Sequence, residues 1–334
     1  MIIGLVSAYD AFLSRLLRVV INRHPEIVLT SDKTIKLSDL SAFDSIAEVQ
    51  DALIEREIES LIRLSHHEQF DWMEKRFGLK LREGLSAWPQ FVEICERRNL
   101  FTHTGGVVSK QYIETCTTHK CEITDIVVGK KLSVTPQYFR LAVKVIYEIG
   151  AKLNHVLWRK FAPDDRDDAD HRLNQVGYEL ILARAYDIAE PILRFGTEVV
   201  KTHGSEKSRR MMVVNLANAL RLQEKKEEAN RILDKEDWSA CDNEFKVCVA
   251  GVKDDVEAVV RFMKQIGADG RPDKEAYRTW PVFRGLRTNE RFMTTFEELF
   301  GESVIIASRE DLDLKDVSPN INEAEDDATP PTKH

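Results

Sequence analysis

The sequence has few cysteines and no long apolar run. Five cysteines among 334 residues are an odd and sparse set, which argues against the disulfide framework of a small secreted protein. No stretch approaches the roughly 18 apolar residues that a membrane-spanning helix requires. Residues 1–17 lack a basic lead-in and are interrupted by charged side chains, which favours an amphipathic helix over a signal peptide. We therefore expect reduced thiols, no membrane partner and a cytoplasmic protein.

Motifs for nucleotides and metals are also missing. The chain has neither a GxxxxGK[ST] loop nor a GxGxxG fingerprint, so nucleotide binding has no support. Cys116, His119 and Cys121 have the spacing of the start of a zinc site, but no fourth ligand follows at a suitable distance. The adjacent His66 and His67 are interpreted as a solvated helix start. We therefore expect no metal and no cofactor.

The negative charge is concentrated at one end of the chain. The formal net charge is -8, and residues 309–334, with eight acidic and three basic side chains, supply -5 of it. The remainder is close to neutral, so no global positive field attracts a polyanion, and any nucleic acid must enter a local cleft. The acidic, proline-containing segment 303–334 is predicted to be disordered.

Helical periodicity dominates the first half of the sequence. We expect helices from the N-terminus to the residue before Pro25, over residues 45–64, 65–77, 86–104 and 107–116, and from Pro136 onward. Residues 26–30 are interpreted as a short strand or an extended loop, and residues 120–134 as a β-hairpin or a loop. The acidic run 163–170 marks a boundary between a domain of residues 1–161 and a second domain of residues 163–302.

The second domain contains a self-match at an offset of 40 residues. The two copies are Leu173, Val176, Gly177, Leu180, Ala189, Leu193 and Val213, Leu216, Ala217, Leu220, Ala229, Leu233. Small residues at equivalent places let antiparallel helices pack closely, which resembles the tetratricopeptide (TPR) pattern, although its usual spacing is about 34. A weaker third copy has Phe245, Val249, Ala258 and Phe262, and residues 280–287 and 292–300 are expected to cap the stack. A plain helical bundle stays the alternative.

The helix expected over residues 86–104 carries the residues suited to chemistry. Arg98 is followed by Asn99 and, five positions after the arginine, by His103. This pattern resembles the signature of the HEPN superfamily: an arginine, usually a polar residue, and a histidine four to six residues later, found in many metal-independent ribonucleases. The resemblance covers about residues 1–161. It implies an all-α chain, with a HEPN-like helical bundle followed by a short TPR-like α-solenoid.

Two interpretations of Arg98 stay open. The arginine falls on an apolar stripe formed by Phe91, Ile94, Cys95 and Phe101. A cation at such a position is costly unless an anion meets it. In one interpretation Arg98 pairs with a carboxylate such as Glu57 or Glu68, and His103 caps the helix end. In the other, Arg98 and His103 are catalytic. The same spacing recurs at Arg166 and His171 in an acidic helix start.

The catalytic interpretation implies transesterification of RNA that leaves 2',3'-cyclic phosphate ends. His103 would take the proton of the ribose 2'-OH or give one to the leaving 5'-oxygen, while Arg98 stabilises the charge on the phosphate. Asn99, one turn before His103, would fix the imidazole tautomer. The expected RNA contacts are Thr102, Gly105, Gly106, Lys110 and Tyr112, with the phosphate held by the glycine pair and by N–H groups at the start of the next helix. Lys110 and Tyr112 are as readily plain surface residues.

Two functions from different classes follow. The resemblance implies a metal-independent endoribonuclease that acts as a homodimer with its motifs face to face, in a toxin–antitoxin or antiviral defence role. The repeat domain would then dock a protein partner. The alternative is a non-catalytic dimeric adaptor, or scaffold, that binds a protein partner through its helical repeats.

Overall fold

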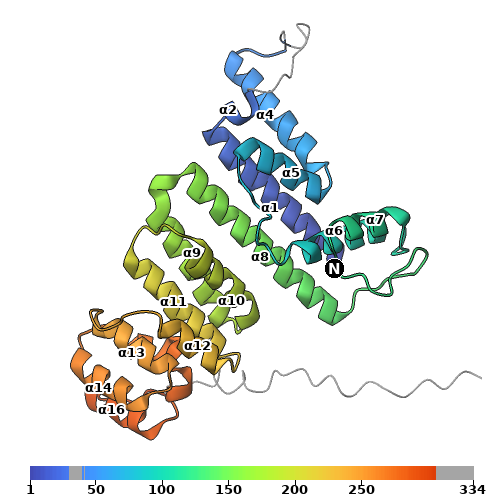
Figure 1. Cartoon of the computed structure of the whole chain (residues 1–334). Coiled ribbons are helices and arrows are strands. Elements are labelled where there is room, and N and C mark those ends of the chain that lie inside the picture. Colours follow the sequence, from blue (N-terminus) through green and yellow to red (C-terminus); the bar gives the residue numbers. More distant parts are fainter. Residues whose placement is uncertain (30–39, 41, 306–334) are drawn as a thin grey trace, which may run out of the picture. The chain divides into compact units, whose positions relative to one another are not determined.

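The computed structural model describes residues 1–29, 40 and 42–305, and within them the chain forms helices and no strand. The expected all-α class is confirmed. The chain divides into two compact units, Met1–Asp237 and Trp238–His334 (Figure 1). The acidic tail predicted to be disordered lies, from residue 306, outside the described residues.

The first half of unit 1 is a bundle of helices with well-defined ends. Its helices are α1 (Ile2–Arg23), α2 (Glu26–Leu29), α4 (Ile46–Ile62), α5 (His66–Phe77), α6 (Trp88–His103), α7 (Lys110–Thr118) and α8 (Pro136–Phe161). Thr135 caps α8 by accepting a hydrogen bond from Tyr138 N–H, with Pro136 in the first turn, where no N–H is needed. The prediction of a strand or extended loop at residues 26–30 is wrong for 26–29, which form the short helix α2.

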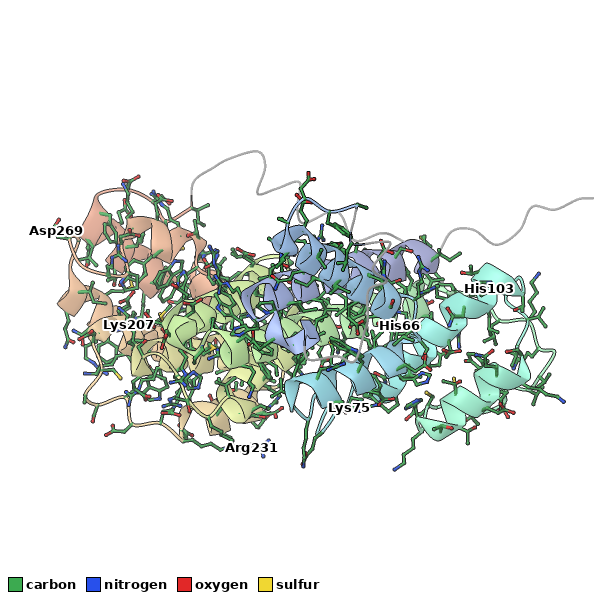
Figure 2. All side chains as sticks on the ribbon, turned by 90° about the horizontal axis from the view of Figure 1, so that it is seen from above. His66, Lys75, His103, Lys207, Arg231 and Asp269 are labelled. Atoms are coloured by element: carbon green, nitrogen blue, oxygen red, sulfur yellow. The ribbon has the colours of Figure 1, made fainter. Side chains whose placement is uncertain are left out.

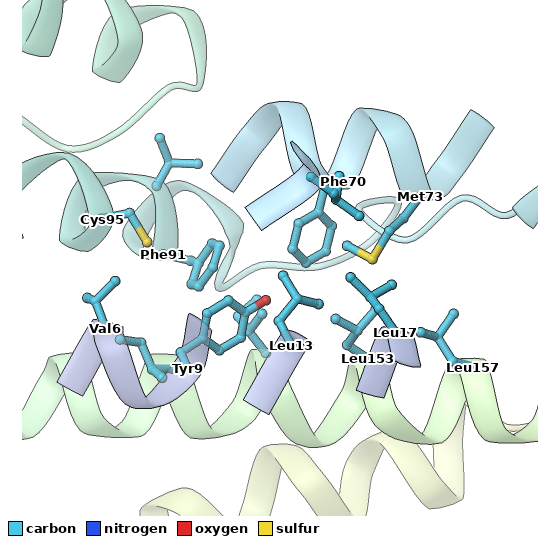
Figure 3. Close-up of a cluster of buried hydrophobic side chains, with 14 of the residues drawn as sticks. Val6, Tyr9, Leu13, Leu17, Phe70, Met73, Phe91, Cys95, Leu153 and Leu157 are labelled. Atoms are coloured by element: carbon cyan, nitrogen blue, oxygen red, sulfur yellow. The ribbon is translucent and has the colours of Figure 1, made fainter. Parts of the chain in front are cut away.

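The core of the bundle lies where α1 crosses between α8 and the pair α5 and α6. One face of α1, carrying Tyr9, Leu13 and Leu17, is buried against Phe70 of α5 and residues of α6 and α8 (Figure 3). These apolar side chains recur every three to four residues, so burying them fixes which face of α1 points inward. The same packing fixes the orientation of α6 and of the residues that α6 presents.

The segment between α6 and α8 is neither a regular hairpin nor a simple loop. Val107 and Lys131 form an isolated antiparallel bridge, and Leu132 N–H donates to Gly106 O at 2.9 Å. The helix α7 begins at Lys110 rather than at the expected residue 107, because Ser109 accepts a hydrogen bond from Tyr112 N–H and so caps the first turn.

The second half of unit 1 consists of helical pairs. The elements are a 3-10 turn η1 (Pro163–Asp165), α9 (Arg166–Leu182), α10 (Tyr186–Arg194), a π-helical turn η2 (Phe195–Val199), α11 (Glu206–Arg221) and α12 (Lys226–Leu233). A Cβ atom added to Gly177 would lie 2.4 Å from Leu193, so this glycine sets how closely α9 approaches α10. The helix α8 packs against both of them. The expected boundary at residues 161–163 therefore lies inside unit 1.

The backbone repeats together with the side chains. Arg184 and Glu224, which are 40 residues apart, end α9 and α11 in the left-handed region with φ of 59° and 62°. The next residue of each turn donates its N–H back into the helix, from Ala185 to Leu180 O at 2.9 Å and from Lys225 to Leu220 O at 3.0 Å. Both turns are Schellman motifs, so the offset of 40 residues is a structural repeat as well as a sequence repeat.

Unit 2 contains a third helical pair and the elements that cover it. These are α13 (Asn243–Val252), α14 (Val256–Ile266), α15 (Lys274–Thr279), a 3-10 turn η3 (Pro281–Leu286) and α16 (Glu290–Phe300), with α16 packed on α14 and η3 on α13. The turn residue here is Asp254, with φ of 55°. Counted from it, Val259 and Met263 occupy the places of Ala189 and Leu193, and both are fully buried. The expected third copy, with Ala258 and Phe262, is therefore displaced by one residue.

Within residues 1–29, 40 and 42–305, no helix combines the length and the apolar character that crossing a bilayer requires.

Candidate functional site

Arg98 is held at the junction of α6 with α1. Its Nη2 donates to Asp10 Oδ2 at 3.2 Å, and its side chain stays 20 % exposed. Its Nε is buried without a hydrogen-bond partner among the described residues. The expected alternative partners were wrong, since Glu57 accepts from the Trp72 indole and Glu68 closes the capping box of α5. The principle behind that interpretation holds, because the cation is met by an internal carboxylate.

Asp10 also binds a histidine that the sequence did not single out. His66 Nε2 lies 2.9 Å from Asp10 Oδ1, and the imidazole packs edge-on against Phe91. His66 is only 6 % exposed, so its interpretation as a solvated helix start was wrong. Arg98, Asp10 and His66 come from α6, α1 and α5, and one carboxylate joins an arginine to an imidazole. We call these three residues the Asp10 cluster.

His103 lies in a different environment. It is the last residue of α6 and its side chain is exposed. Figure 2 shows His103 at the end of α6, well away from His66. Because α6 stays helical through His103, Arg98 lies about 140° round the helix from it. Unwinding before Gly105 does not bring the two side chains of one chain together.

The predicted partner of His103 is engaged elsewhere. The Asn99 amide donates to Glu96 Oε1 at 3.3 Å, and in the described part of the chain no hydrogen bond joins Asn99 to His103. Burial raises the pKa of Glu96, while the hydrogen bond from Asn99 and the charge of Arg98 oppose that shift. Asn99 therefore satisfies a buried carboxyl instead of fixing the imidazole.

The two glycines after α6 have different roles. Gly105 has φ of 62° and open space around its missing Cβ, so it turns the chain and leaves its backbone accessible. Gly106 is buried, and a Cβ there would lie 2.9 Å from Phe101 and 3.1 Å from Leu132 O. Its assignment as an RNA contact was wrong, because it is needed for packing. Thr102 is exposed and donates its hydroxyl to Arg98 O.

The N–H groups expected to hold a phosphate after the glycines are used by the fold. Val107 N–H donates to Thr104 O at 3.2 Å, and Val108 N–H donates to Lys130 O at 2.9 Å. Lys110, the first residue of α7, is exposed. Any anion at this end of the molecule therefore meets the exposed side chains of Lys110 and His103 rather than the N–H groups of residues 107 and 108.

Tyr112 is an interior residue, which corrects its assignment as an RNA contact or a surface residue. It is 1 % exposed, and its hydroxyl donates to Glu93 Oε1 at 2.6 Å. Glu93 also accepts from Tyr138 at 2.6 Å and from Arg97 Nε at 2.7 Å. Burial, followed by the charge of Glu93, raises the pKa of both tyrosines. Glu93 thus ties α7 and α8 to α6, and we call these four residues the Glu93 hub.

The cysteines and histidines near α7 do not assemble a metal centre. His67 and His119 come together with ring centroids 4.9 Å apart, and burial followed by the charge of His67 lowers the pKa of His119. In the described residues no group of three or more His, Cys, Asp and Glu side chains is arranged to hold a metal ion.

Three cavities line unit 1 away from these residues. One of about 360 Å³ lies between α1, α8 and α9, one of about 290 Å³ between the C-terminal halves of α1 and α8, and one of about 240 Å³ beside the loop after α5. Neither Arg98 nor His103 lines any of the three. The candidate site is therefore a surface at the end of α6 and not an enclosed pocket.

Comparisons with protein-family models, with curated proteins and with solved structures found no match to this chain.

Proposed function

We propose that the chain is a metal-independent endoribonuclease of HEPN type that acts as a homodimer. One protomer supplies Arg98 and the other supplies His103 to the same phosphodiester. The observation that carries the proposal is that α6 presents a partly exposed guanidinium, held by Asp10, and an exposed imidazole near its C-terminal end.

The need for two protomers follows from the helix geometry. Side chains about 140° apart on one helix face different surroundings, so a single α6 does not bring both groups to one phosphate. In a two-fold dimer the same surface of each copy meets its equivalent, which can place Arg98 of one α6 beside His103 of the other. Val107, Val127 and Val128 are exposed by 38 %, 63 % and 53 % close to that end of the chain. Exposed apolar side chains of this kind favour an interface.

The Asp10 cluster suits Arg98 for phosphate binding. Asp10 occupies one Nη, and a guanidinium has five N–H donors in a fixed fork, so others remain for a phosphate oxygen. His103 is free of the core and can move a proton between the ribose 2'-OH, the leaving 5'-oxygen and solvent. Neither role involves a metal ion.

Cleavage of a labelled single-stranded RNA in EDTA tests the proposal. We expect products with 2',3'-cyclic phosphate ends, identified by mass spectrometry. Arg98→Ala and His103→Ala should each lower the rate by about 100-fold or more, as removal of a general acid–base or of a charge-stabilising group does. Arg98→Lys should restore little, because a lysine lacks the planar fork.

Arg166 and His171 provide the matched control. They have the same five-residue spacing, both are exposed, and they lie on α9. Arg166→Ala and His171→Ala should leave cleavage unchanged. Variants of Arg98 and His103 that cut as fast as the wild type, with circular dichroism unchanged, would end the nuclease proposal.

The pairing of Arg98 with Asp10 also favours a second function, a non-catalytic dimeric adaptor. An arginine neutralised by an internal carboxylate stabilises the fold whether or not it meets a substrate. In this function the helical pairs bind a protein partner and α6 contributes only to dimerisation. A wild-type chain that is dimeric by light scattering and cuts no RNA would support the adaptor.

A further inference from the structure

The C-terminal end of α7 brings two cysteines together. The helix ends in a Schellman motif, in which Cys121 N–H donates to Cys116 O at 2.8 Å and Lys120 N–H donates to Thr117 O at 3.1 Å. Lys120 supplies the required left-handed residue, with φ of 57°. This motif regularly places the side chains of its first and last hydrogen-bonded residues in contact. Here those residues are Cys116 and Cys121.

The two thiols are in contact but have different surroundings. They share a side-chain hydrogen bond, and neither is in a disulfide. Cys116 is fully buried among Leu100, Val108 and Tyr112. Cys121 is partly exposed, and its Sγ lies 3.0 Å from Pro89 O. One sulfur is thus open to a solvent oxidant, and the other waits behind it in the interior.

We propose that Cys116 and Cys121 are a reversible redox pair that a hydroperoxide converts into a disulfide at the end of α7. This site is independent of Arg98 and His103 and does not require the proposed nuclease activity.

The order of the chemistry follows from the two environments. The hydrogen bond from Cys116 lowers the pKa of Cys121, whereas that bond and burial raise the pKa of Cys116. The Cys121 thiolate attacks the peroxide, so that an S–O bond forms, the O–O bond breaks, and hydroxide leaves. The Cys116 thiol then attacks that sulfenic sulfur, so that the S–S bond forms and water departs with the Cys116 proton. Two thiols are oxidised and one peroxide is reduced to two waters.

The sequence offers a direct readout of the linkage. Trypsin cuts after Lys110, Lys120 and Lys130, so Cys116 and Cys121 fall in two separate peptides, residues 111–120 and 121–130. The full chain is treated with hydrogen peroxide, alkylated with N-ethylmaleimide and digested without reductant. We expect the two peptides joined, at the sum of their masses less two hydrogens. Dithiothreitol should return both peptides to the thiol form.

Variants separate the attacking sulfur from the resolving one. Cys116→Ser should leave Cys121 as a sulfenic acid that dimedone traps, while Cys121→Ser should abolish both the trapping and the linkage. If Cys116→Ser does not fold, as judged by circular dichroism, Cys116→Ala provides the same test with an apolar side chain. Cys241→Ser, which changes another partly exposed cysteine, should not alter the linkage.

The competing outcomes are distinct. Cys121 that proceeds to sulfinic acid in the wild type, or a disulfide that joins Cys121 to a cysteine other than Cys116, overturns the proposal. Joined peptides 111–120 and 121–130 that are released by dithiothreitol support it. Both outcomes are read on wild-type protein and stay the same whether or not the chain cuts RNA.

Discussion

The bundle formed by α1–α8 and the helical pairs formed by α9–α12 are held together in different ways. In the bundle, key polar side chains meet partners far along the chain, as Arg98 meets Asp10 across 88 positions and Tyr138 meets Glu93 across 45. In the helical pairs, small residues recur at fixed places and set the helix spacing. Gly177 against Leu193 is the closest such approach.

This difference separates what is costly to change in each region. Charged groups that are removed from water need all of their partners, and the loss of one leaves the others unsatisfied. Small residues between helices need only to remain small. The bundle should therefore be most sensitive to a change of chemistry, and the helical pairs to a change of volume.

Glu93→Leu should have the largest effect on stability. It removes the acceptor shared by Arg97, Tyr112 and Tyr138, and a buried charge that loses its partner typically costs about 3–5 kcal/mol. Urea unfolding followed by circular dichroism measures the change. Glu93→Gln keeps an acceptor oxygen in place and should lose less. Equal stability of Glu93→Leu and wild type would contradict the account of the Glu93 hub.

His155, in α8 at the border between the two regions, should make stability depend on pH. Burial, followed by the charge of Arg159, lowers the pKa of His155 to about 4 from its usual 6.5. Between those pH values the unfolded chain binds a proton that the folded chain does not, so stability is full above pH 6.5 and is lost as the pH falls. At about 1.4 kcal/mol per pKa unit the loss approaches 3 kcal/mol near pH 4.

The contribution of His155 is isolated by difference. The free energies of unfolding of wild type and His155→Gln, measured from pH 7 to pH 4, should converge on acidification, because glutamine does not titrate. A parallel pair of pH profiles would show that His155 is not the group responsible. The exposed His171 provides a matched control, since His171→Gln should leave the wild-type profile unchanged.

Gly177→Val tests the sensitivity of the helical pairs to volume. Its side chain would enter the space of Leu193, and overpacking of this kind costs typically about 1–3 kcal/mol. The matched control is Gly4→Ala in α1, where nothing lies within 4 Å of the added Cβ. That change should stabilise the chain by about 0.5–1 kcal/mol through helix propensity. A gain in stability from Gly177→Val would contradict the close approach of α9 and α10.

Glu55→Gln should have the smallest effect and sharpens the prediction for Glu93. Glu55 accepts two hydrogen bonds from Arg18, at 2.7 Å and 2.5 Å, but the two side chains are 46 % and 41 % exposed. Exposed pairs contribute about 0.2–1 kcal/mol, and salt weakens them. The loss, measured in the same urea experiment, should nearly vanish at 1 M NaCl. A loss as large as that of Glu93→Leu would mean that burial does not decide the cost.

Local features of the fold were readable from the sequence. The helix ends at Ser65 and Gly78, the proline start of α8 and the repeat at an offset of 40 all depend on residues within a few turns of one another. The displacement of the third pair was missed because Phe262 and Val259 are both apolar. Only the left-handed residue Asp254 reveals the register, and nothing in its side chain requires that conformation.

The candidate site was predicted less well, for a physical reason. Asp10 and His66 belong with Arg98 because three helices cross, and no spacing along the chain encodes such a crossing. Tyr112 gave no signal of burial, since tyrosine is common both at surfaces and in cores. An alternation of glutamate, arginine and tyrosine over α6, α7 and α8 is the one pattern that could have indicated the Glu93 hub.

The central claim is that Arg98 and His103 act together from two different protomers. Arg98→Ala and His103→Ala chains, each inactive alone, are mixed under conditions that exchange subunits and assayed on RNA in EDTA. The account predicts that activity returns, because a mixed dimer contains one intact Arg98 and one intact His103 that face each other. If the wild type cuts RNA and the mixture stays as inactive as either variant alone, a site shared in this way is contradicted.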